Sequence, residues 1–281
     1  MGIIKEKMIQ DLGISGMSKR TQESYLWCIK QFVKYYMKSP DLLTLEDINS
    51  YQLYLKRDRQ ISVSYFNIQV AALKFLYGVT LKREWNIELI PYHKESKRLP
   101  VVLSKEEVVQ LYKAVSYIKH KAMILTLYST GIRASELTHL KVSDIDSKRM
   151  QIRIDQGKGG KDRYVRLSEK LLKILRLYWC SEKIKPKTWL FPGYGEDSPL
   201  SRHSVQKMIL KAREKAGIQK HVTTHTVRHT CATHMLESGE NIKKIALMLG
   251  HSSLKTTGKY LHVASNYLDN MKTPLDDLEL D

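Results

Sequence analysis

The chain has 281 residues, of which 42% are hydrophobic and 27% are charged. This composition excludes a disordered tail or a low-complexity scaffold, and the length fits about two globular domains. Lys and Arg number 47 against 29 Asp and Glu, which gives a formal net charge of +18. Both the first 100 residues and the remainder carry an excess of basic side chains. Such a charge predicts a polyanionic partner that contacts both halves of the chain.

No apolar run reaches the ~18 residues that a membrane helix needs, and the N-terminus lacks the apolar core of a secretory signal. We therefore expect a soluble, cytoplasmic protein without a membrane partner. Three cysteines, Cys28, Cys180 and Cys231, lie far apart and form no CxxC pair. This pattern fits reduced core residues better than disulfides or a zinc site.

The first 90 residues have the pattern of a small helical bundle. From Ser18, an N-cap candidate, apolar residues recur with a helical period as far as Tyr36. Thr44 and Asp47 form the capping-box pattern that opens a second helix, and another apolar-rich helix follows.

A proline-bounded segment separates this bundle from the rest. Residues 91–100, PYHKESKRLP, contain few apolar side chains and several basic ones, which is typical of a linker. We place an N-terminal helical domain at residues 1–90, the linker at 91–102 and a second domain at 103–281.

The second domain has a mixed pattern. Ser104 and Glu107 form a capping box that opens a helical stretch. Apolar and polar residues alternate from Met150 to Ile154, and an extended segment follows a glycine-rich turn, so we expect a β-hairpin. The remainder is mostly helical. The predicted fold class is mainly α, with an N-terminal helical bundle and a helix-rich α+β domain that contains a small antiparallel sheet.

Several common chemistries lack their motifs. There is no GxxxxGK[ST] phosphate loop and no GxGxxG after a strand, so nucleotide-dependent chemistry is unsupported. His225 and His229 are four residues apart on a helix, but no glutamate or third ligand accompanies them as in a zinc hydrolase. We therefore expect no metal and no cofactor.

Basic side chains instead collect at predicted helix starts. In STGIRASELTHL, Arg133 follows a helix-breaking glycine, where backbone N–H groups favour an anion, and Glu136 is placed to orient it. In TTHTVRHTCATHML, His225 and Arg228 project together from the first turn of a helix. Taken singly, Arg133 and Glu136 are better explained as a surface salt bridge, and His225 is equally well explained as a partly buried structural histidine.

Two further segments complete the set of candidates. Lys158 lies among three glycines at the tip of the hairpin, where the backbone approaches a ligand closely. In LGHSSLKTTGKYLHV, His251 follows a helix-ending glycine and Tyr260 comes nine residues later. Because the chain has 16 tyrosines, position alone does not mark Tyr260 as catalytic.

As an ordered set, these motifs resemble the tyrosine recombinase (phage integrase) family of site-specific DNA recombinases, above all its Xer-type and integron-integrase-like members. SKRTQESYLWCIKQFVKYY resembles the start of the family's SAM-like core-binding domain, and the stretch from LSKEEV to YLHV resembles its catalytic domain. The motifs supply the family's catalytic residues in order: Arg133, Glu136 as supporting acid, Lys158, His225, Arg228, His251 and Tyr260 as the nucleophile. Gly258 departs from the pattern and should weaken the local helix by about 1 kcal/mol relative to alanine.

The resemblance implies an enzyme that cleaves and rejoins DNA strands through a 3′-phosphotyrosyl intermediate, without metal or nucleotide. Arg133, Arg228 and His251 would stabilise charge on the phosphate. His225 would accept the proton of Tyr260, whose pKa the arginine charges would lower, and Lys158 would protonate the leaving 5′ oxygen.

The expected partner is double-stranded DNA with a specific recombination site. The resemblance further implies a homotetramer on two such sites, with a dimer on one site as a smaller assembly, in the bacterial nucleoid. Accessory proteins are left open. Two rival interpretations are a non-catalytic DNA-binding protein of the same fold and a topoisomerase-like enzyme that nicks and reseals one strand. The complete set of site residues argues against the first, and the N-terminal resemblance argues against the second.

Overall fold

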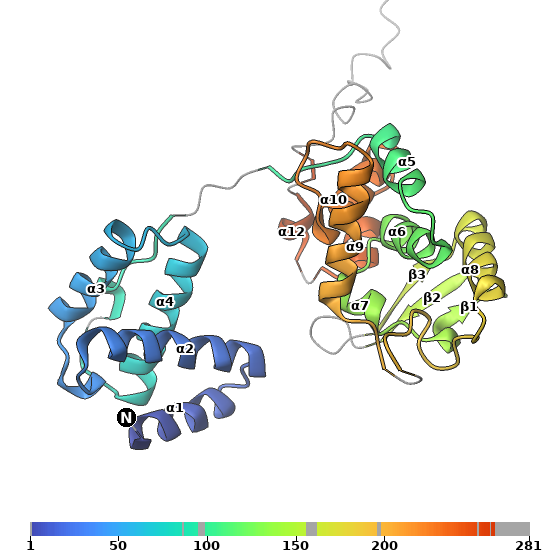
Figure 1. Cartoon of the computed structure of the whole chain (residues 1–281). Coiled ribbons are helices and arrows are strands. Elements are labelled where there is room, and N and C mark those ends of the chain that lie inside the picture. Colours follow the sequence, from blue (N-terminus) through green and yellow to red (C-terminus); the bar gives the residue numbers. More distant parts are fainter. Residues whose placement is uncertain are drawn as a thin grey trace, which may run out of the picture. The chain divides into compact units, whose positions relative to one another are not determined.

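The structure is a computed structural model that describes residues 2–85, 87–94, 99–155, 162–195, 198–251, 253–258 and 260–261. The chain divides into two compact units, residues 1–97 and 98–281. Figure 1 labels the elements of both units along the chain.

The N-terminal unit is helical throughout. Its elements are α1 (Gly2–Ile14), α2 (Lys19–Tyr36), a 3-10 turn (Pro40–Leu42), α3 (Leu45–Arg57), α4 (Val63–Phe75), a π-helical segment (Leu76–Thr80) and a second 3-10 turn (Ile87–Leu89). Helix α2 packs against α4 and α1, and α3 packs against α4.

The sequence signals for these helices are confirmed. Ser18 caps α2, since its side chain accepts a hydrogen bond from the Thr21 N–H. Thr44 and Asp47 form the complete capping box at the start of α3, in which the Thr44 N–H donates to the Asp47 carboxylate over 2.8 Å. These caps satisfy backbone donors that helix starts otherwise leave without partners.

The second unit combines helices with one small sheet. Its elements are α5 (Lys105–Lys113), α6 (Ile118–Thr130), α7 (Ala134–Thr138), a 3-10 turn (Val142–Asp144), β1 (Ile145–Asp146), β2 (Gln151–Ile154), β3 (Arg163–Arg166), α8 (Glu169–Ser181), α9 (Arg202–Lys215), α10 (Thr224–Glu237), α11 (Ile242–Leu249) and α12 (Leu254–Gly258). The Ser104–Glu107 capping box at α5 is confirmed.

The sheet is antiparallel with strand order β1-β2-β3. The predicted hairpin is confirmed as β2 and β3, in which Ile152 pairs with Val165 and both side chains enter the core. Strand β1 was not predicted, because two residues are too short for an alternating pattern to show. The hairpin tip with Lys158 lies outside the described residues. The mainly α fold class with a small antiparallel sheet is confirmed.

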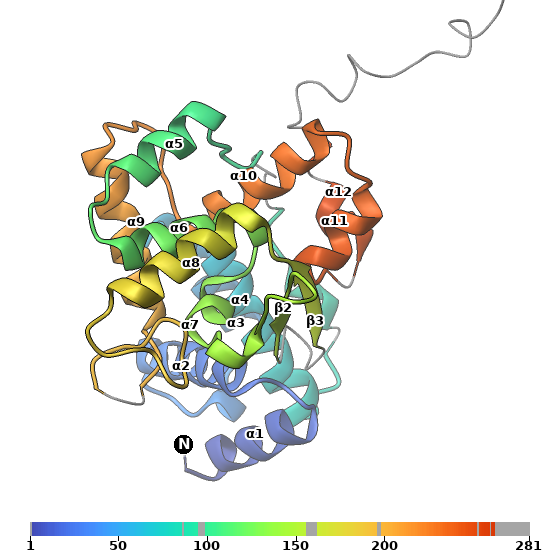
Figure 2. The same cartoon turned by 90° about the vertical axis from the view of Figure 1, so that its right-hand side faces the viewer.

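The packing of α10 and α11 prepares the site. Helix α10 contacts α6, α9 and α11, and α11 also contacts α12 and β3. Figure 2 shows α11 on the side of the unit where β3 lies. The end of α6, the start of α10, the end of α11 and strand β3 therefore meet in one region of this unit.

All three cysteines are free, and their burial differs from the expectation of three core residues. Cys28 and Cys231 are buried, but Cys180 is exposed near the end of α8. Among the described residues, no helix combines the length and apolar composition that crossing a bilayer requires.

Candidate active site

Arg133 is placed by the glycine that ends α6. Gly131 adopts φ +60°, and its N–H donates to the Leu127 carbonyl over 3.0 Å. The chain then turns so that Arg133 occupies the N-cap position of α7. Its side chain donates to the Glu136 carboxylate over 2.8 Å and to the Gly250 carbonyl over 3.3 Å. The predicted orientation of Arg133 by Glu136 is therefore present.

Glu136 holds a second arginine that the sequence analysis missed. Arg163, on β3, donates to both carboxylate oxygens over 2.9 and 2.8 Å, and its Nε donates to the Met248 carbonyl over 2.8 Å. Burial alone would raise the pKa of Glu136, but the hydrogen bonds from Arg163 and Arg133 outweigh it and lower the pKa to about 2. Glu136 is thus an ionised carboxylate that fixes two guanidinium groups.

Arg228 is the most enclosed cation of the site, with 4% of its surface exposed. Its guanidinium donates to the carbonyls of Gly131 and Leu249 and to Nε2 of His251, the last over 3.1 Å. Burial and the neighbouring charge of Arg133 lower its pKa to about 10, so it stays protonated at neutral pH. Those bonds use three of the five N–H donors of a guanidinium, which leaves donors for a ligand.

His251 follows Gly250, whose φ of +64° ends α11. Because an arginine nitrogen has no acceptor capacity, Nε2 of His251 must accept from Arg228. Its Nδ1 then carries the proton and donates to the Thr257 hydroxyl over 2.8 Å. Arg228 and Thr257 thereby fix both the orientation and the tautomer of this imidazole.

Tyr260 is buried, with 1% of its surface exposed, and its hydroxyl lies 2.9 Å from Nδ1 of His229. Burial raises the pKa of Tyr260 to about 12, whereas the charges of Arg228 and Arg133 lower it, as the sequence predicted for the arginines. Desolvation of the phenolate outweighs the attraction of the cations.

Sequence reasoning also missed His229, which it considered only as a possible metal ligand together with His225. Its position on α10 directly after the predicted Arg228 was the signal that could have identified it. His225 lies one turn earlier on an exposed part of α10, with its ring centroid 6.3 Å from that of His229. The base role predicted for His225 thus has a second candidate, His229, in contact with the phenol.

Five of the seven predicted residues lie together in this region: Arg133, Glu136, Arg228, His251 and Tyr260. His225 is near them through its contact with His229, and Lys158 lies outside the described residues. No group of three or more His, Cys, Asp or Glu residues is close enough to hold a metal ion in the part of the chain that the structure describes.

Comparison with known proteins places both units in one family. Residues 101–266 match the model of the phage integrase family, and residues 4–87 match that of its N-terminal SAM-like domain. A putative integrase/recombinase of Sinorhizobium fredii is 42% identical over 274 residues, covering 97% of this chain and 88% of the relative. Tyrosine recombinase XerA of Pyrococcus furiosus is 32% identical over 271 residues, covering 94% and 91%.

Solved structures agree with this assignment. A crystal structure of XerA recombinase matches with 30% identity and a TM-score of 0.55, covering 95% of this chain and 96% of that one. A lambda integrase dimer bound to a COC′ core site matches in fold with a TM-score of 0.74 and 19% identity, covering 91% and 96%. The chain belongs to the phage integrase family. Within it, the protein is a tyrosine-type site-specific recombinase, as the sequence motifs predicted.

Proposed function

We propose that the protein cleaves and rejoins DNA strands at a specific site through a 3′-phosphotyrosyl link to Tyr260, without metal or nucleotide. The observation that carries this proposal is the convergence of two arginines and a histidine with a buried tyrosine. Arg133, Arg228 and His251 are joined by hydrogen bonds through the ends of α6 and α11. The charges of both arginines act on Tyr260.

The arginines stabilise the reacting phosphate. A phosphodiester carries negative charge that repels a nucleophile, and this charge concentrates as phosphorus becomes pentacoordinate. Guanidinium donors that are already held in place stabilise such a transition state by roughly 3 to 4 kcal/mol each. Because Glu136 and backbone carbonyls hold Arg133 and Arg228, little reorganisation is needed when the phosphate arrives.

The nucleophile needs a base in direct contact. With a pKa of about 12, forming the phenolate at pH 7 costs roughly 7 kcal/mol. We assign His229 to accept the phenolic proton as the Tyr260 oxygen attacks phosphorus, because its Nδ1 lies 2.9 Å from that oxygen. The bond from phosphorus to the 5′ oxygen breaks in the same step, and Lys158 is proposed to protonate this leaving oxygen.

Strand exchange then follows without an energy source. A 5′ hydroxyl from a second duplex attacks the phosphotyrosyl phosphorus, releases Tyr260 and forms a new phosphodiester. We propose that this occurs in a homotetramer on two DNA sites. The lambda integrase structures include a dimer on a core site and a tetramer on a Holliday junction, which supports the proposal. In the proposed tetramer, residues 1–90 of each chain bind DNA, residues 91–102 form the linker and residues 103–281 carry out catalysis.

A nicked suicide duplex incubated with chelator tests the proposal. We expect a covalent protein–DNA adduct for the wild type and for Tyr164→Phe, which alters an exposed tyrosine of β3. Tyr260→Phe should form none. An adduct that persists in Tyr260→Phe, or one that requires added magnesium, would contradict the proposed chemistry.

The two histidines are separated by comparing His229→Ala with His225→Ala on the same substrate. Loss of the base in contact with the phenol should slow cleavage by roughly 10² to 10⁴-fold. We expect this loss for His229→Ala. If His225→Ala slows cleavage more than His229→Ala does, the base is His225.

A further inference from the structure

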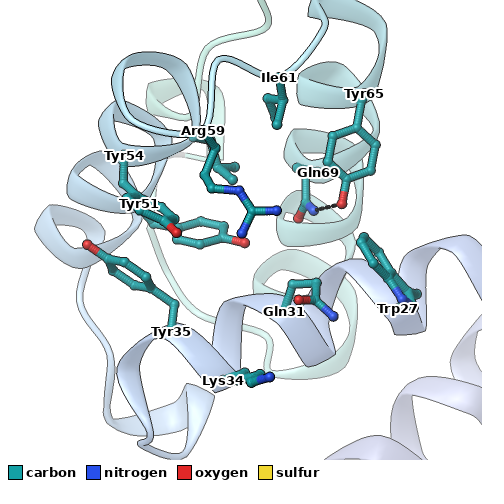
Figure 3. A pocket seen from close by; sticks show the side chains of 11 residues that line it. Trp27, Gln31, Lys34, Tyr35, Tyr51, Tyr54, Arg59, Ile61, Tyr65 and Gln69 are labelled. Atoms are coloured by element: carbon teal, nitrogen blue, oxygen red, sulfur yellow. Dashed lines mark hydrogen bonds between the residues drawn. The ribbon is translucent and has the colours of Figure 1, made fainter.

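A second concave site lies in the N-terminal unit, enclosed by α2, α3, α4 and the loop between α3 and α4. It has a volume of about 240 Å³. Figure 3 shows the side chains that surround it. They are five aromatic residues, two cations, two amides and two aliphatic residues: Trp27, Tyr35, Tyr51, Tyr54, Tyr65, Lys34, Arg59, Gln31, Gln69, Leu55 and Ile61. None of these described lining residues is acidic.

The aromatic side chains form two walls. On one side, the rings of Trp27 and Tyr65 meet edge to face with centroids 5.9 Å apart. On the other side, Tyr35 lies 4.4 Å from Tyr54 and 5.2 Å from Tyr51 between ring centroids. Figure 3 shows the two groups on opposite sides of the hollow. Planar rings on facing sides suit a flat heteroaromatic ligand.

Gln69 gives the pocket a buried amide oxygen without a hydrogen-bond partner. The residue is 1% exposed, and its Nε2 donates to the Tyr65 hydroxyl over 2.6 Å. Its Oε1 is buried and accepts no hydrogen bond. In Figure 3 the amide points into the hollow toward Arg59. A buried amide oxygen without a donor is destabilising, so a ligand N–H placed there would recover that loss.

Arg59 is held over the pocket by its backbone. Gln60 adopts φ +44°, a left-handed conformation that is uncommon for a residue other than glycine. The loop is tied back to α3, because the Arg59 N–H donates to the Tyr54 carbonyl and the Ile61 N–H to the Leu55 carbonyl. This arrangement directs the guanidinium across the pocket, and Lys34 adds a second positive charge.

We propose that this pocket binds one unstacked nucleotide, with the base between the aromatic walls, a base N–H donating to Gln69, and the phosphate bound by Arg59 and Lys34. The volume lies at the small end of ligand pockets, which fits one nucleotide and not a run of stacked bases. Two ligands present such a base together with a phosphate, namely a free nucleotide and an unpaired nucleotide in DNA. The second source rests on the proposed function, because it requires the chain to bind DNA.

The test compares three probes with the full-length protein. They are a labelled paired duplex of unrelated sequence, the same duplex with one extra unpaired adenine, and dAMP. A stacked base contributes roughly 1 to 3 kcal/mol, so we expect the bulged duplex to bind about tenfold more tightly than the paired duplex. Millimolar dAMP should reduce this preference. Titration calorimetry with dAMP alone measures the free nucleotide directly.

Matched variants locate the effect. Arg59→Ala and Gln69→Leu should bring the ratio of the two affinities close to one and abolish dAMP binding. Arg57→Ala removes an equivalent exposed cation that does not line the pocket, and it should weaken both duplexes equally and preserve the ratio. Arg59→Ala changes only an exposed side chain, so it remains informative if Gln69→Leu fails to fold.

The outcomes separate the pocket from the proposed function. A bulge preference that Arg59→Ala removes supports DNA as the source, and dAMP binding without a bulge preference supports a free nucleotide. A ratio near one together with no dAMP binding overturns the proposal. So does a loss of the bulge preference in Arg57→Ala that is as large as the loss in Arg59→Ala. If neither duplex binds, the proposed function fails, but the dAMP titration still decides whether the pocket binds a nucleotide.

Discussion

The cations of the active site and its nucleophile are held in different ways. Arg133, Arg163 and Arg228 are each anchored by backbone carbonyls, and the first two also by the buried Glu136. Tyr260 instead contacts His229 through its hydroxyl. The cations are thus fixed by backbone carbonyls and a buried carboxylate, whereas the proposed nucleophile is placed by side-chain contacts, including the apolar cluster of Leu236, Ile245 and Leu249.

This division suits a reaction that must run in both directions. In the proposed reaction, fixed cations stabilise the same pentacoordinate phosphorus during cleavage and rejoining, so their positions need not change. The proposed nucleophile must approach phosphorus, form a bond and leave again. Its raised pKa also keeps it protonated until a base takes the proton.

We expect the largest loss of stability when Glu136, the carboxylate shared by Arg133 and Arg163, is removed. Glu136→Ala removes a buried carboxylate and leaves Arg133 and Arg163 close together without their counter-charge. Breaking a buried ion pair in this way typically costs 3 to 5 kcal/mol. Urea unfolding should show this loss. Lys244 pairs with Glu240 at an exposed position, so Glu240→Ala is the control and should cost less than about 1 kcal/mol. Similar losses in both variants would reject the special role of Glu136.

A second test alters the geometry of a cation and keeps its charge. Arg228→Lys cannot reproduce three directed hydrogen bonds, because an ammonium lacks the planar fork of a guanidinium. We expect cleavage of the suicide substrate to slow by roughly 10² to 10³-fold. Arg176→Lys on α8 serves as a control outside the site and should leave the rate unchanged. Full activity of Arg228→Lys would show that charge alone is sufficient.

Local signals predicted much of the fold and of the site from the sequence. Ser18, Thr44 and Ser104 were recognisable caps, because capping depends on residues within three positions of each other. Arg133 and Arg228 were recognisable from glycine and helix-start motifs. The β2–β3 hairpin was visible from alternation across a glycine-rich turn.

The missed features depend on contacts between distant segments. Arg163 on β3 reaches Glu136 on α7 across 27 residues of chain, and no spacing along the chain reveals that contact. His225 and His229 share one helix, so which of them contacts the phenol depends on where the later part of the chain places Tyr260. The pKa of Tyr260 depends on its burial, which no single motif encodes.

The pH dependence of stability sharpens the contrast within the site. The pKa of Glu136 is about 2 in the folded protein against an ordinary value of 4.5. Its ionised form therefore stabilises the fold fully above pH 4.5, and this contribution of about 3 kcal/mol is lost as the pH falls toward 2. We expect the free energy of unfolding of the wild type to fall more steeply in this window than that of Glu136→Gln. Parallel curves for the two proteins would contradict the assigned pKa.

The smallest predicted effect concerns the backbone that holds Arg228. Gly131 and Gly217 both have positive φ, of +60° and +69°, so alanine at either position costs roughly 1 to 2 kcal/mol in backbone strain. A Cβ on Gly131 would also lie 2.7 Å from Cδ2 of the buried Leu249, whereas one on Gly217 would meet nothing within 4 Å. Gly131→Ala should therefore be the less stable variant in thermal unfolding.

Only Gly131→Ala should also slow cleavage, because the Gly131 carbonyl accepts a hydrogen bond from Arg228. Displacing Leu249 shifts a second acceptor of the same guanidinium, so both anchors move together. Gly217→Ala carries the same backbone strain away from these anchors and should cleave at the wild-type rate. If the two variants lose equal stability and cleave equally fast, the backbone around Arg228 tolerates displacement, and the contrast between backbone-anchored cations and a nucleophile placed by side-chain contacts no longer holds.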